Sequence, residues 1–329
     1  MQVPETYTLR NRRNMEMEIS SLGATIMSLK VPDKTGKPVN VVVGLSSASD
    51  YLTELYLEQG LYLGSTIGRH AGRISGGGFE LGGKRYPLYN HNGVHLHGGK
   101  EAFDKKIWMV ESEESGDDPS ITLTYFSPHL EEGYPGNLKI SVKYALTEDK
   151  ELNIGFRATT DQSTVLNVTN HAYFNLNGKG SILDHELELK ADSYLDLNED
   201  LIPTGKFNPL RGSLYDYREK SRIGKSGFNG LDDIFIKYGK GEKAIISSEE
   251  SGIRMTVVSN QPAVVIYTPP QFAKLPFKDG VVFNRYPAIC FETQGFPDAI
   301  NNDNFPSTLL SPLDVYESET SFKFSLVEK

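Results

Sequence analysis

Strand-like segments follow one another along almost the whole chain, and they constrain the fold more than any other feature. Residues 15–31, 120–127, 138–147 and 152–160 alternate apolar and polar side chains and are rich in β-branched and aromatic types. Alternation with a period of two predicts strands with one buried face. The 31 glycines and 17 prolines, with many Asn and Asp residues, provide the turns between such strands.

Helical spacing of apolar residues is nearly absent, and the best candidate helix is a short one in SSASDYLTEL, residues 46–55. Strands from start to finish predict an all-β fold, a large antiparallel β-sandwich, rather than a parallel α/β sheet. No linker-like segment interrupts the pattern, so we expect a single domain over residues 1–329. The glycine-rich SGGGFELGGKRYPL lacks the spacing of a phosphate-binding loop and precedes no helix pattern, which favours a hairpin.

The net charge, the apolar segments and the cysteine content exclude several classes of binding partner and site. A net charge of −9 is spread along the chain without a basic block, which argues against nucleic-acid binding. No segment approaches the ~18 apolar residues of a membrane span, and the first residues contain no apolar signal region. A single cysteine, Cys290, excludes an internal disulfide and a Cys-rich zinc site. We therefore expect a cytoplasmic protein, a monomer or homodimer, with no membrane or nucleic-acid partner.

His95, His97 and Glu101 form the pattern HxHxxxE, which is the core of the metal-binding motif of cupins, another β-sandwich class. Imidazole and carboxylate groups together suit a transition metal. However, Gly98 and Gly99 should end the strand directly after the histidines, whereas a metal site needs ligands on rigid backbone. We therefore predict no metal site, and solvated or hydrogen-bonded histidines are the alternative.

Three other stretches concentrate polar groups in strand-like surroundings. NVTNHAYFNLNG places His171 among asparagines that include Asn175, and AICFETQGFPDAINN places Glu292 directly after an apolar run. GRHAGRIS holds Arg69 and Arg73 four residues apart. Buried polar or ionised groups are costly unless they are hydrogen-bonded or serve a site. Each stretch alone has a structural explanation, but their occurrence in one chain favours a site.

These stretches and several others, in order, resemble the aldose 1-epimerase or galactose mutarotase family. The resemblance is collinear over nearly the whole chain. The segments that carry it include IGRHAGRISGGGFELGGKRYPL, NGVHLHGG, FDKKIW, EEGYPGNLKISVKYAL, NVTNHAYFNLNG, FNGLDDIFI and FETQGFPDAINNDNFPSTLL. The resemblance implies the family's single-domain sandwich of many antiparallel strands, the galactose mutarotase-like supersandwich, which agrees with the strand pattern.

The resemblance also implies an isomerase that interconverts the α and β anomers of a free aldose, such as galactose or glucose, without a cofactor. By position in the family motifs, Glu292 matches the general base at the C1 hydroxyl and His171 the general acid at the ring oxygen. His97 matches a second histidine near the ring oxygen. Arg73 and Asp232 match residues that hold sugar hydroxyls.

The chemistry of these residue types suits the implied roles. A carboxylate is ionised at neutral pH and an imidazole can carry a proton there. Opposite charges across one pocket are expected to raise the pKa of His171 and to lower that of Glu292. Asn175, from the polar cluster, and Tyr267, whose ring could contact sugar C–H groups, are further substrate-binding candidates. His95 is expected to be structural.

Three positions depart from the common family pattern: Gly72 replaces a usual asparagine, Val265 a frequent glutamine and Asp233 a frequent histidine. The loss of two hydrogen-bonding groups predicts that the reaction is kept and that the sugar preference can differ. Alternatives are a non-catalytic carbohydrate-binding protein, a hexose-phosphate mutarotase using the arginines, and a cupin-type metal enzyme. A glycosidase would normally need a second cooperating carboxylate.

Overall fold

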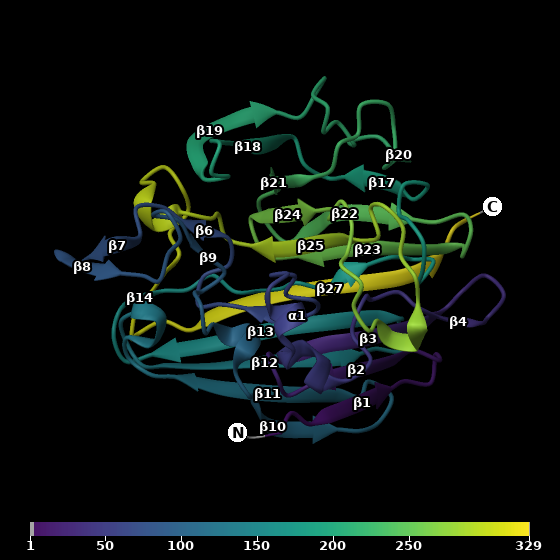
Figure 1. Ribbon diagram of the computed structural model, residues 1–329, viewed down its shortest axis with the longest axis horizontal. Helices are drawn as coiled ribbons and strands as arrows, with labels where there is room; N and C mark the ends of the chain where they lie inside the picture. Colours follow the sequence, from purple (N-terminus) through teal and green to yellow (C-terminus); the bar gives the residue numbers. More distant parts are fainter. Residues whose placement is uncertain (1–2, 329) are drawn as a thin grey trace.

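The computed structural model describes residues 3–328 and is built mainly from antiparallel strands (Figure 1). The largest sheet has nine strands in the order β10 (Met109–Glu114), β11 (Ser120–Ser127), β12 (Leu138–Leu146), β13 (Glu151–Thr160), β27 (Tyr316–Leu326), β23 (Ile253–Ser259), β22 (Gly241–Ser247), β17 (Glu186–Leu189) and β20 (Ser221–Arg222). A six-stranded sheet has the order β16 (Tyr173–Phe174), β25 (Ile289–Gln294), β24 (Ala263–Tyr267), β21 (Asp232–Ile236), β18 (Ser193–Leu197) and β19 (Pro203–Pro209). A four-stranded sheet contains β1 (Thr6–Arg10), β2 (Glu16–Ser20), β3 (Thr25–Pro32) and β4 (Pro38–Asn40).

Short strand pairs complete the architecture. They are β5 (Thr66–Ile67) with β15 (Thr169–Asn170), β6 (Arg73–Ile74) with β9 (His95–Leu96), β7 (Gly78–Leu81) with β8 (Lys84–Pro87), and β14 (Thr164–Val165) with β26 (Leu309–Leu310). All paired strands are antiparallel, which confirms the predicted fold class. The β7–β8 hairpin turns through Gly82 and Gly83 with φ of 59° and 74°, as a two-residue hairpin turn requires. The glycine-rich segment is thus a hairpin, as predicted.

Helices are few and short. The predicted helix corresponds to a 3₁₀ turn, η1 (Ala48–Leu52), followed by α1 (Glu54–Leu57), where the Thr53 side chain accepts a hydrogen bond from the Tyr56 backbone N–H. The other 3₁₀ turns are η2 (Phe103–Lys105), η3 (Glu131–Gly133), η4 (Lys278–Gly280) and η5 (Ala299–Asn301). Within residues 3–328, none of these helices is long and apolar enough to span a membrane.

The two faces of the six-stranded sheet have different environments. Phe235, Ile266 and Phe291 belong to the main apolar core together with Phe322 of the nine-stranded sheet. Burial of each large apolar side chain stabilises the fold by about 1.5–3 kcal/mol. Because side chains alternate along a strand, the residues between these apolar ones face the other side. That second face carries the polar residues described next.

Candidate active site

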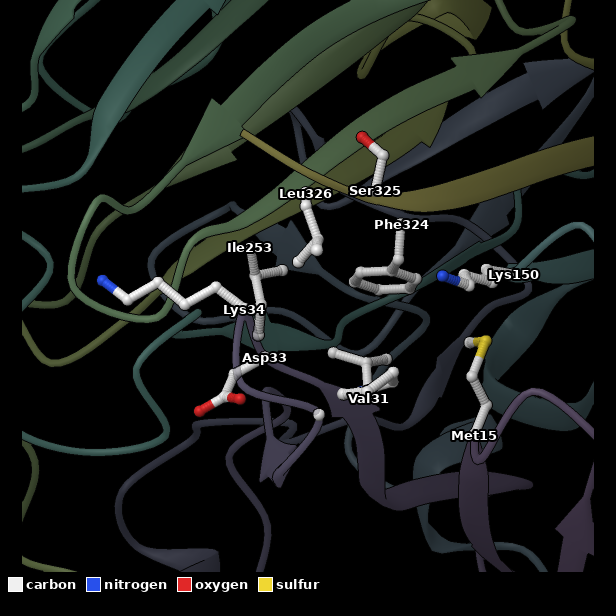
Figure 2. A pocket seen from close by; sticks show the side chains of 11 residues that line it. Met15, Val31, Asp33, Lys34, Lys150, Ile253, Phe324, Ser325 and Leu326 are labelled. Carbon is white, nitrogen blue, oxygen red and sulfur yellow. The ribbon is translucent and has the colours of Figure 1, made fainter. Parts of the chain in front are cut away.

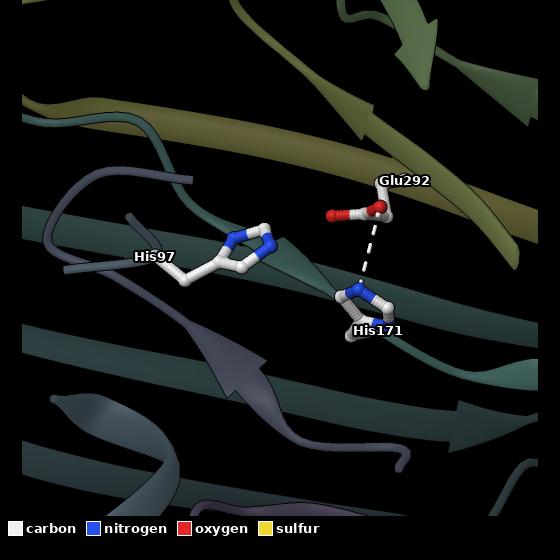
Figure 3. Close-up of side chains that lie close together, drawn as sticks. All are labelled: His97, His171 and Glu292. Carbon is white, nitrogen blue, oxygen red and sulfur yellow. Dashed lines mark ion pairs between the residues drawn. The ribbon is translucent and has the colours of Figure 1, made fainter. Parts of the chain in front are cut away.

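A buried side-chain contact joins Glu292 and His171 (Figure 3). Glu292 lies in the middle of β25, and His171 lies in the short link between β15 and β16. Carboxylate Oε1 is 3.5 Å from imidazole Nε2, and both side chains are about 4% exposed. Two residues far apart in the sequence therefore meet in one buried place.

His97 completes the cluster from a third segment. Strand β9 ends at Leu96, and His97 adopts a left-handed conformation with φ of 48°. The two histidines of the HxH pattern therefore do not lie on one continuous strand. The His97 ring centroid is 5.5 Å from that of His171, and ligand-type atoms of His97, His171 and Glu292 all lie within 4.8 Å of one another.

Hydrogen bonding decides what His97 can offer to a ligand. The backbone N–H of Gly72 donates to Nδ1 of His97 over 3.2 Å, so a neutral imidazole carries its own proton on Nε2. A metal-bound histidine instead donates from its other ring nitrogen and uses a free lone pair for the metal. In this arrangement His97 is a hydrogen-bond donor to the pocket rather than a metal ligand.

The cupin-type set of residues is not brought together. Glu101 is exposed, and its backbone N–H donates to Glu132. His95 is buried between the Tyr134 hydroxyl, 2.6 Å from Nε2, and the Tyr89 carbonyl, 2.6 Å from Nδ1. His95 is therefore structural, as expected, and both of its ring nitrogens are already paired.

Arg73, Asp232 and Tyr267 form the partly exposed side of the cluster. Arg73 pairs across β6 and β9 with Leu96, directly before His97, and its charge acts on both Glu292 and Asp232. Asp232 and Tyr267 are direct partners on β21 and β24. The structure thus gathers every predicted site residue except Asn175. Glu292 and His171 are buried, whereas His97, Arg73, Asp232 and Tyr267 are partly exposed.

Asn175 does not join this cluster. Its side chain is fully buried, and Nδ2 donates to the carbonyls of Lys179 at 3.0 Å and Pro287 at 2.7 Å. Its Oδ1 accepts from the Asn177 backbone N–H at 3.0 Å. These bonds use both amide hydrogens to hold the local backbone, so the side chain has no donor left for a sugar.

The first arginine of GRHAGRIS is also structural. Arg69 is 2% exposed and donates five hydrogen bonds from its guanidinium group. Its partners are Ser127 Oγ and the carbonyls of Ser127, Pro128, Pro135 and Gly136. Only Arg73 of the two arginines therefore faces the site.

Burial controls the protonation of the acid–base pair. It raises the pKa of Glu292 to about 8, with a further rise from Asp232 that Arg73 opposes. Burial lowers the pKa of His171 to about 4 and that of His97 well below its usual value. The expectation that mutual attraction would raise the pKa of His171 and lower that of Glu292 is therefore wrong. Loss of hydration outweighs that attraction, and the empty pair is neutral.

The three residues that depart from the family pattern, Gly72, Val265 and Asp233, lie in different environments. Gly72 has a φ of 77°, and a Cβ there would lie 2.7 Å from Cγ of Pro297, so a side chain would be strained and would require the Pro297 ring to move. Val265 pairs with Glu292 across β24 and β25 and belongs to a small apolar cluster. Asp233 follows Asp232 on β21 and therefore faces the opposite side of the sheet.

Three further residues of the site were not identified from the sequence. The Tyr62 ring lies 4.8 Å from that of His97 and 5.8 Å from that of His171, with a backbone φ of 54°. Cys290 Sγ lies 3.6 Å from His171 Nδ1, and the Tyr173 ring lies 5.0 Å from the His171 ring. The position of Cys290 two residues before Glu292 on a strand was the one available signal. Nothing in the sequence marked Tyr62.

A separate hollow lies away from this cluster, between the turn after β3 and the end of β27 (Figure 2). Val31, Ile253 and Phe324 are among the residues that line it, together with Lys34 and Lys150. None of the predicted site residues lines this hollow.

Comparison with known proteins agrees with the geometry. The model of the aldose 1-epimerase family matches residues 5–323. Galactose mutarotase of Homo sapiens is 39% identical over 95% of this chain and 92% of its own length, and aldose 1-epimerase of Escherichia coli K12 is 30% identical over 96% and 94%. An aldose epimerase homologue from C. elegans has a TM-score of 0.91 at 28% identity, covering 99% of this chain and all of that one. A galactose 1-epimerase from Lactobacillus acidophilus has a TM-score of 0.85 at 27% identity, with complete coverage of both chains.

The family match spans nearly all of the described residues, and the structural likeness includes the sheets that carry the acid–base pair. On this combined ground of sequence, fold and site geometry, the chain belongs to the aldose 1-epimerase family.

Proposed function

We propose that this enzyme interconverts the α and β anomers of a free aldose, with Glu292 and His171 as base and acid. The observation that carries this proposal is the 3.5 Å contact between Glu292 Oε1 and His171 Nε2. The C1 hydroxyl and the ring oxygen of an aldose are bonded to the same carbon. A base and an acid this close can therefore act on both oxygens of one hemiacetal, which is the geometry that general acid–base catalysis requires.

Ring opening then moves two protons. The Glu292 carboxylate takes the proton from the C1 hydroxyl, and the electron pair of that O–H bond forms the aldehyde C=O bond. The C1–O5 bond breaks, and its electron pair takes the proton of the His171 imidazolium. Rotation about the C1–C2 bond and reversal of these steps close the ring on the other face of the aldehyde.

The unusual pKa values fit this scheme. The cyclic sugar reacts with the ionised pair, whereas the open-chain aldehyde is accompanied by a protonated Glu292 and a neutral His171. Burial favours the neutral pair, as the raised pKa of Glu292 and the lowered pKa of His171 indicate. The neutral pair is therefore both the resting state and the state that accompanies the open-chain aldehyde, and a proton must pass from Glu292 to His171 before the cyclic sugar reacts.

The surrounding residues bind and orient the sugar. We assign His97, whose proton lies on Nε2, as a donor to the ring oxygen or a neighbouring hydroxyl. Arg73 and Asp232 are a donor and an acceptor for hydroxyl groups at the open side, and Tyr267 presents an aromatic ring beside Asp232.

The site chemistry favours a neutral sugar over a sugar phosphate. A phosphate group needs clustered Arg or Lys donors. Of the two arginines considered, only Arg73 faces the cluster, where it accompanies two acidic groups, Asp232 and Glu292. A purely binding function would not require an acid and a base in contact, so catalysis is the better explanation of the pair.

The sugar preference can be measured directly. We expect the purified protein to accelerate mutarotation of freshly dissolved α-glucose and α-galactose, followed by polarimetry or NMR. The rates for xylose and maltose, measured in the same way, would then rank the aldoses by preference. Glucose 6-phosphate is expected to react more slowly, because the pocket has a net acidic character. Preferential turnover of the phosphate would contradict the neutral-sugar assignment.

The pH dependence of kcat/KM is expected to be bell-shaped. His171 titrates near pH 4 and Glu292 near pH 8. Between these two pH values the two groups together hold one proton. Below the lower value both groups are protonated and no base remains; above the upper value neither is protonated and no acid remains. Rates corrected for the spontaneous reaction should decline on both sides of this window. A profile that stays flat beyond pH 9 would contradict the shared-proton pair.

We further propose that residues 1–329 form one domain, which the family match over residues 5–323 supports. A cytoplasmic location, with a monomer or homodimer as the working form, remains our prediction. The single buried cysteine is compatible with a reducing compartment.

A further inference from the structure

Tyr62 contacts both histidines of the site but takes no part in the proposed proton transfers. It lies in the loop between α1 and β5. Its ring centroid is 4.8 Å from that of His97, in an edge-on arrangement, and 5.8 Å from that of His171. The tyrosine ring therefore forms a wall that the two imidazoles share.

The backbone of this loop holds Tyr62 in a conformation that a tyrosine rarely adopts. Its φ of 54° lies in the left-handed region, which is unfavourable for a large L side chain. The residues that follow are fixed, because the Leu63 N–H donates to the Tyr56 hydroxyl at 2.9 Å. The Gly64 N–H donates to the His171 carbonyl at 3.0 Å. Strain of this kind is concentrated at functional sites, and here it directs the ring against the two histidines.

The Tyr62 hydroxyl is a donor without a protein partner. Within residues 3–328 it makes no hydrogen bond, yet it is not among the fully buried polar atoms that lack a partner. Solvent therefore reaches the hydroxyl, although burial raises the pKa of Tyr62 above its usual value, so the group keeps its proton. The charges of Arg73 and Glu292 both act on it, which places it at the sugar pocket.

The order of the site groups places Tyr62 beside carbon 5 of a bound sugar. The ring oxygen is bonded to C1 and C5, and C5 carries the hydroxymethyl group of an aldohexose. Glu292, the base for the C1 hydroxyl, contacts the imidazole of His171, whereas Tyr62 is closer to that of His97. With the ring oxygen at the imidazoles and C1 toward Glu292, C5 is directed toward His97 and Tyr62.

We infer that Tyr62 donates its hydroxyl proton to the C6 hydroxyl of an aldohexose and thereby makes the site prefer aldohexoses to aldopentoses. This inference rests on the proposed function, because that function places C1 at Glu292. A site that hydrogen-bonds a substrate hydroxyl discriminates against an analogue that lacks it. Xylose has no C6 group and leaves the Tyr62 hydroxyl with water alone.

Glucose, 6-deoxyglucose and xylose test this contact, because they share the configuration at C2, C3 and C4 and differ only in the substituent of C5. For the wild-type enzyme we expect KM to be about fivefold higher for 6-deoxyglucose than for glucose, the usual effect of one neutral hydrogen bond. KM for xylose should be at least as high as for 6-deoxyglucose. Tyr62→Phe keeps the ring and removes the hydroxyl. It should raise KM for glucose about fivefold, more than it changes kcat, and leave KM for 6-deoxyglucose within about twofold.

Tyr56→Phe is the matched control for the structure of the loop. The buried Tyr56 hydroxyl accepts the Leu63 N–H directly after Tyr62, so its removal disturbs the loop without removing a sugar contact. This variant should change KM for glucose and 6-deoxyglucose by the same factor. An equal change for both sugars in Tyr62→Phe as well would show that Tyr62 only supports the loop, and the inference would be overturned.

Dissociation constants separate this inference from the proposed function. NMR titrations of wild-type and Tyr62→Phe protein with glucose and 6-deoxyglucose measure binding whether or not the protein is catalytic. The expected difference in binding, in a protein without mutarotase activity, would refute the proposed function and support the Tyr62 contact. Equal affinity of the wild-type protein for the two sugars, or no binding of either, overturns the contact even if mutarotation is normal.

Discussion

Replacing Glu292 with glutamine is expected to lower the rate of mutarotation by about 100-fold or more while the fold is kept, because a general base typically contributes that much. Glutamine has nearly the same shape as the carboxyl group but cannot accept the C1 hydroxyl proton. Since burial already favours the protonated, uncharged form of Glu292, the neutral amide should not strain the empty site. Polarimetry of α-glucose gives the rate, and thermal unfolding gives the stability.

Asp233→Asn is the matched control for this substitution. Asp233 is also a buried carboxyl whose pKa is raised by burial, to about 6, but it faces the opposite side of the six-stranded sheet. Its carboxylate accepts a hydrogen bond from the Asp232 backbone N–H, and asparagine keeps an acceptor oxygen for that bond. The rate should therefore stay within about twofold of the original, since the acid–base pair itself is unchanged. Near-normal turnover by the Glu292→Gln enzyme would remove Glu292 from the mechanism.

Substitution of His171 by asparagine should also reduce kcat by about 100-fold or more, the usual contribution of a positioned acid. Asparagine can keep a polar group near Cys290, but it lacks the atom corresponding to Nε2, which lies 3.5 Å from Glu292. The sugar would then have to break its C1–O5 bond without a proton on the ring oxygen. KM should change much less than kcat, because the groups that bind the hydroxyls are still present.

His185→Asn provides the comparison for His171. Burial lowers the pKa of His185 to about 4, as it does for His171, but Nε2 of His185 accepts a hydrogen bond from the Leu176 backbone N–H rather than facing Glu292. This variant should lose stability rather than activity per folded molecule. An equal loss of kcat in the two variants would indicate a general effect of removing a buried imidazole and not an acid at position 171.

The predicted directions of the pKa shifts of His171 and Glu292 were wrong because they depend on burial, which cannot be read from the sequence. Residue types alone suggested an ionised glutamate attracting a protonated histidine. The attraction depends on the distance between the groups, and the opposing cost depends on how much water each group loses. Both Glu292 and His171 are almost completely buried, so desolvation determines the direction of both pKa shifts. Burial on this scale is a property of the packed sheets and not of any local segment.

The sequence by itself determined the strands, because alternation with a period of two is a local property: β11 begins and ends at the predicted residues, and β12 and β13 differ by one residue at an end. The sequence also identified Glu292 and His171 as base and acid candidates, because the family motifs occur in it in the same order. Only the tertiary structure decided which polar residues meet. Asn175 donates to the Pro287 carbonyl and Arg69 to the Pro135 carbonyl, so both side chains hold distant backbone segments together outside the site. Cys290, by contrast, contacts His171 within the site. Contacts between distant segments depend on strand register and sheet packing, and no local pattern encodes them.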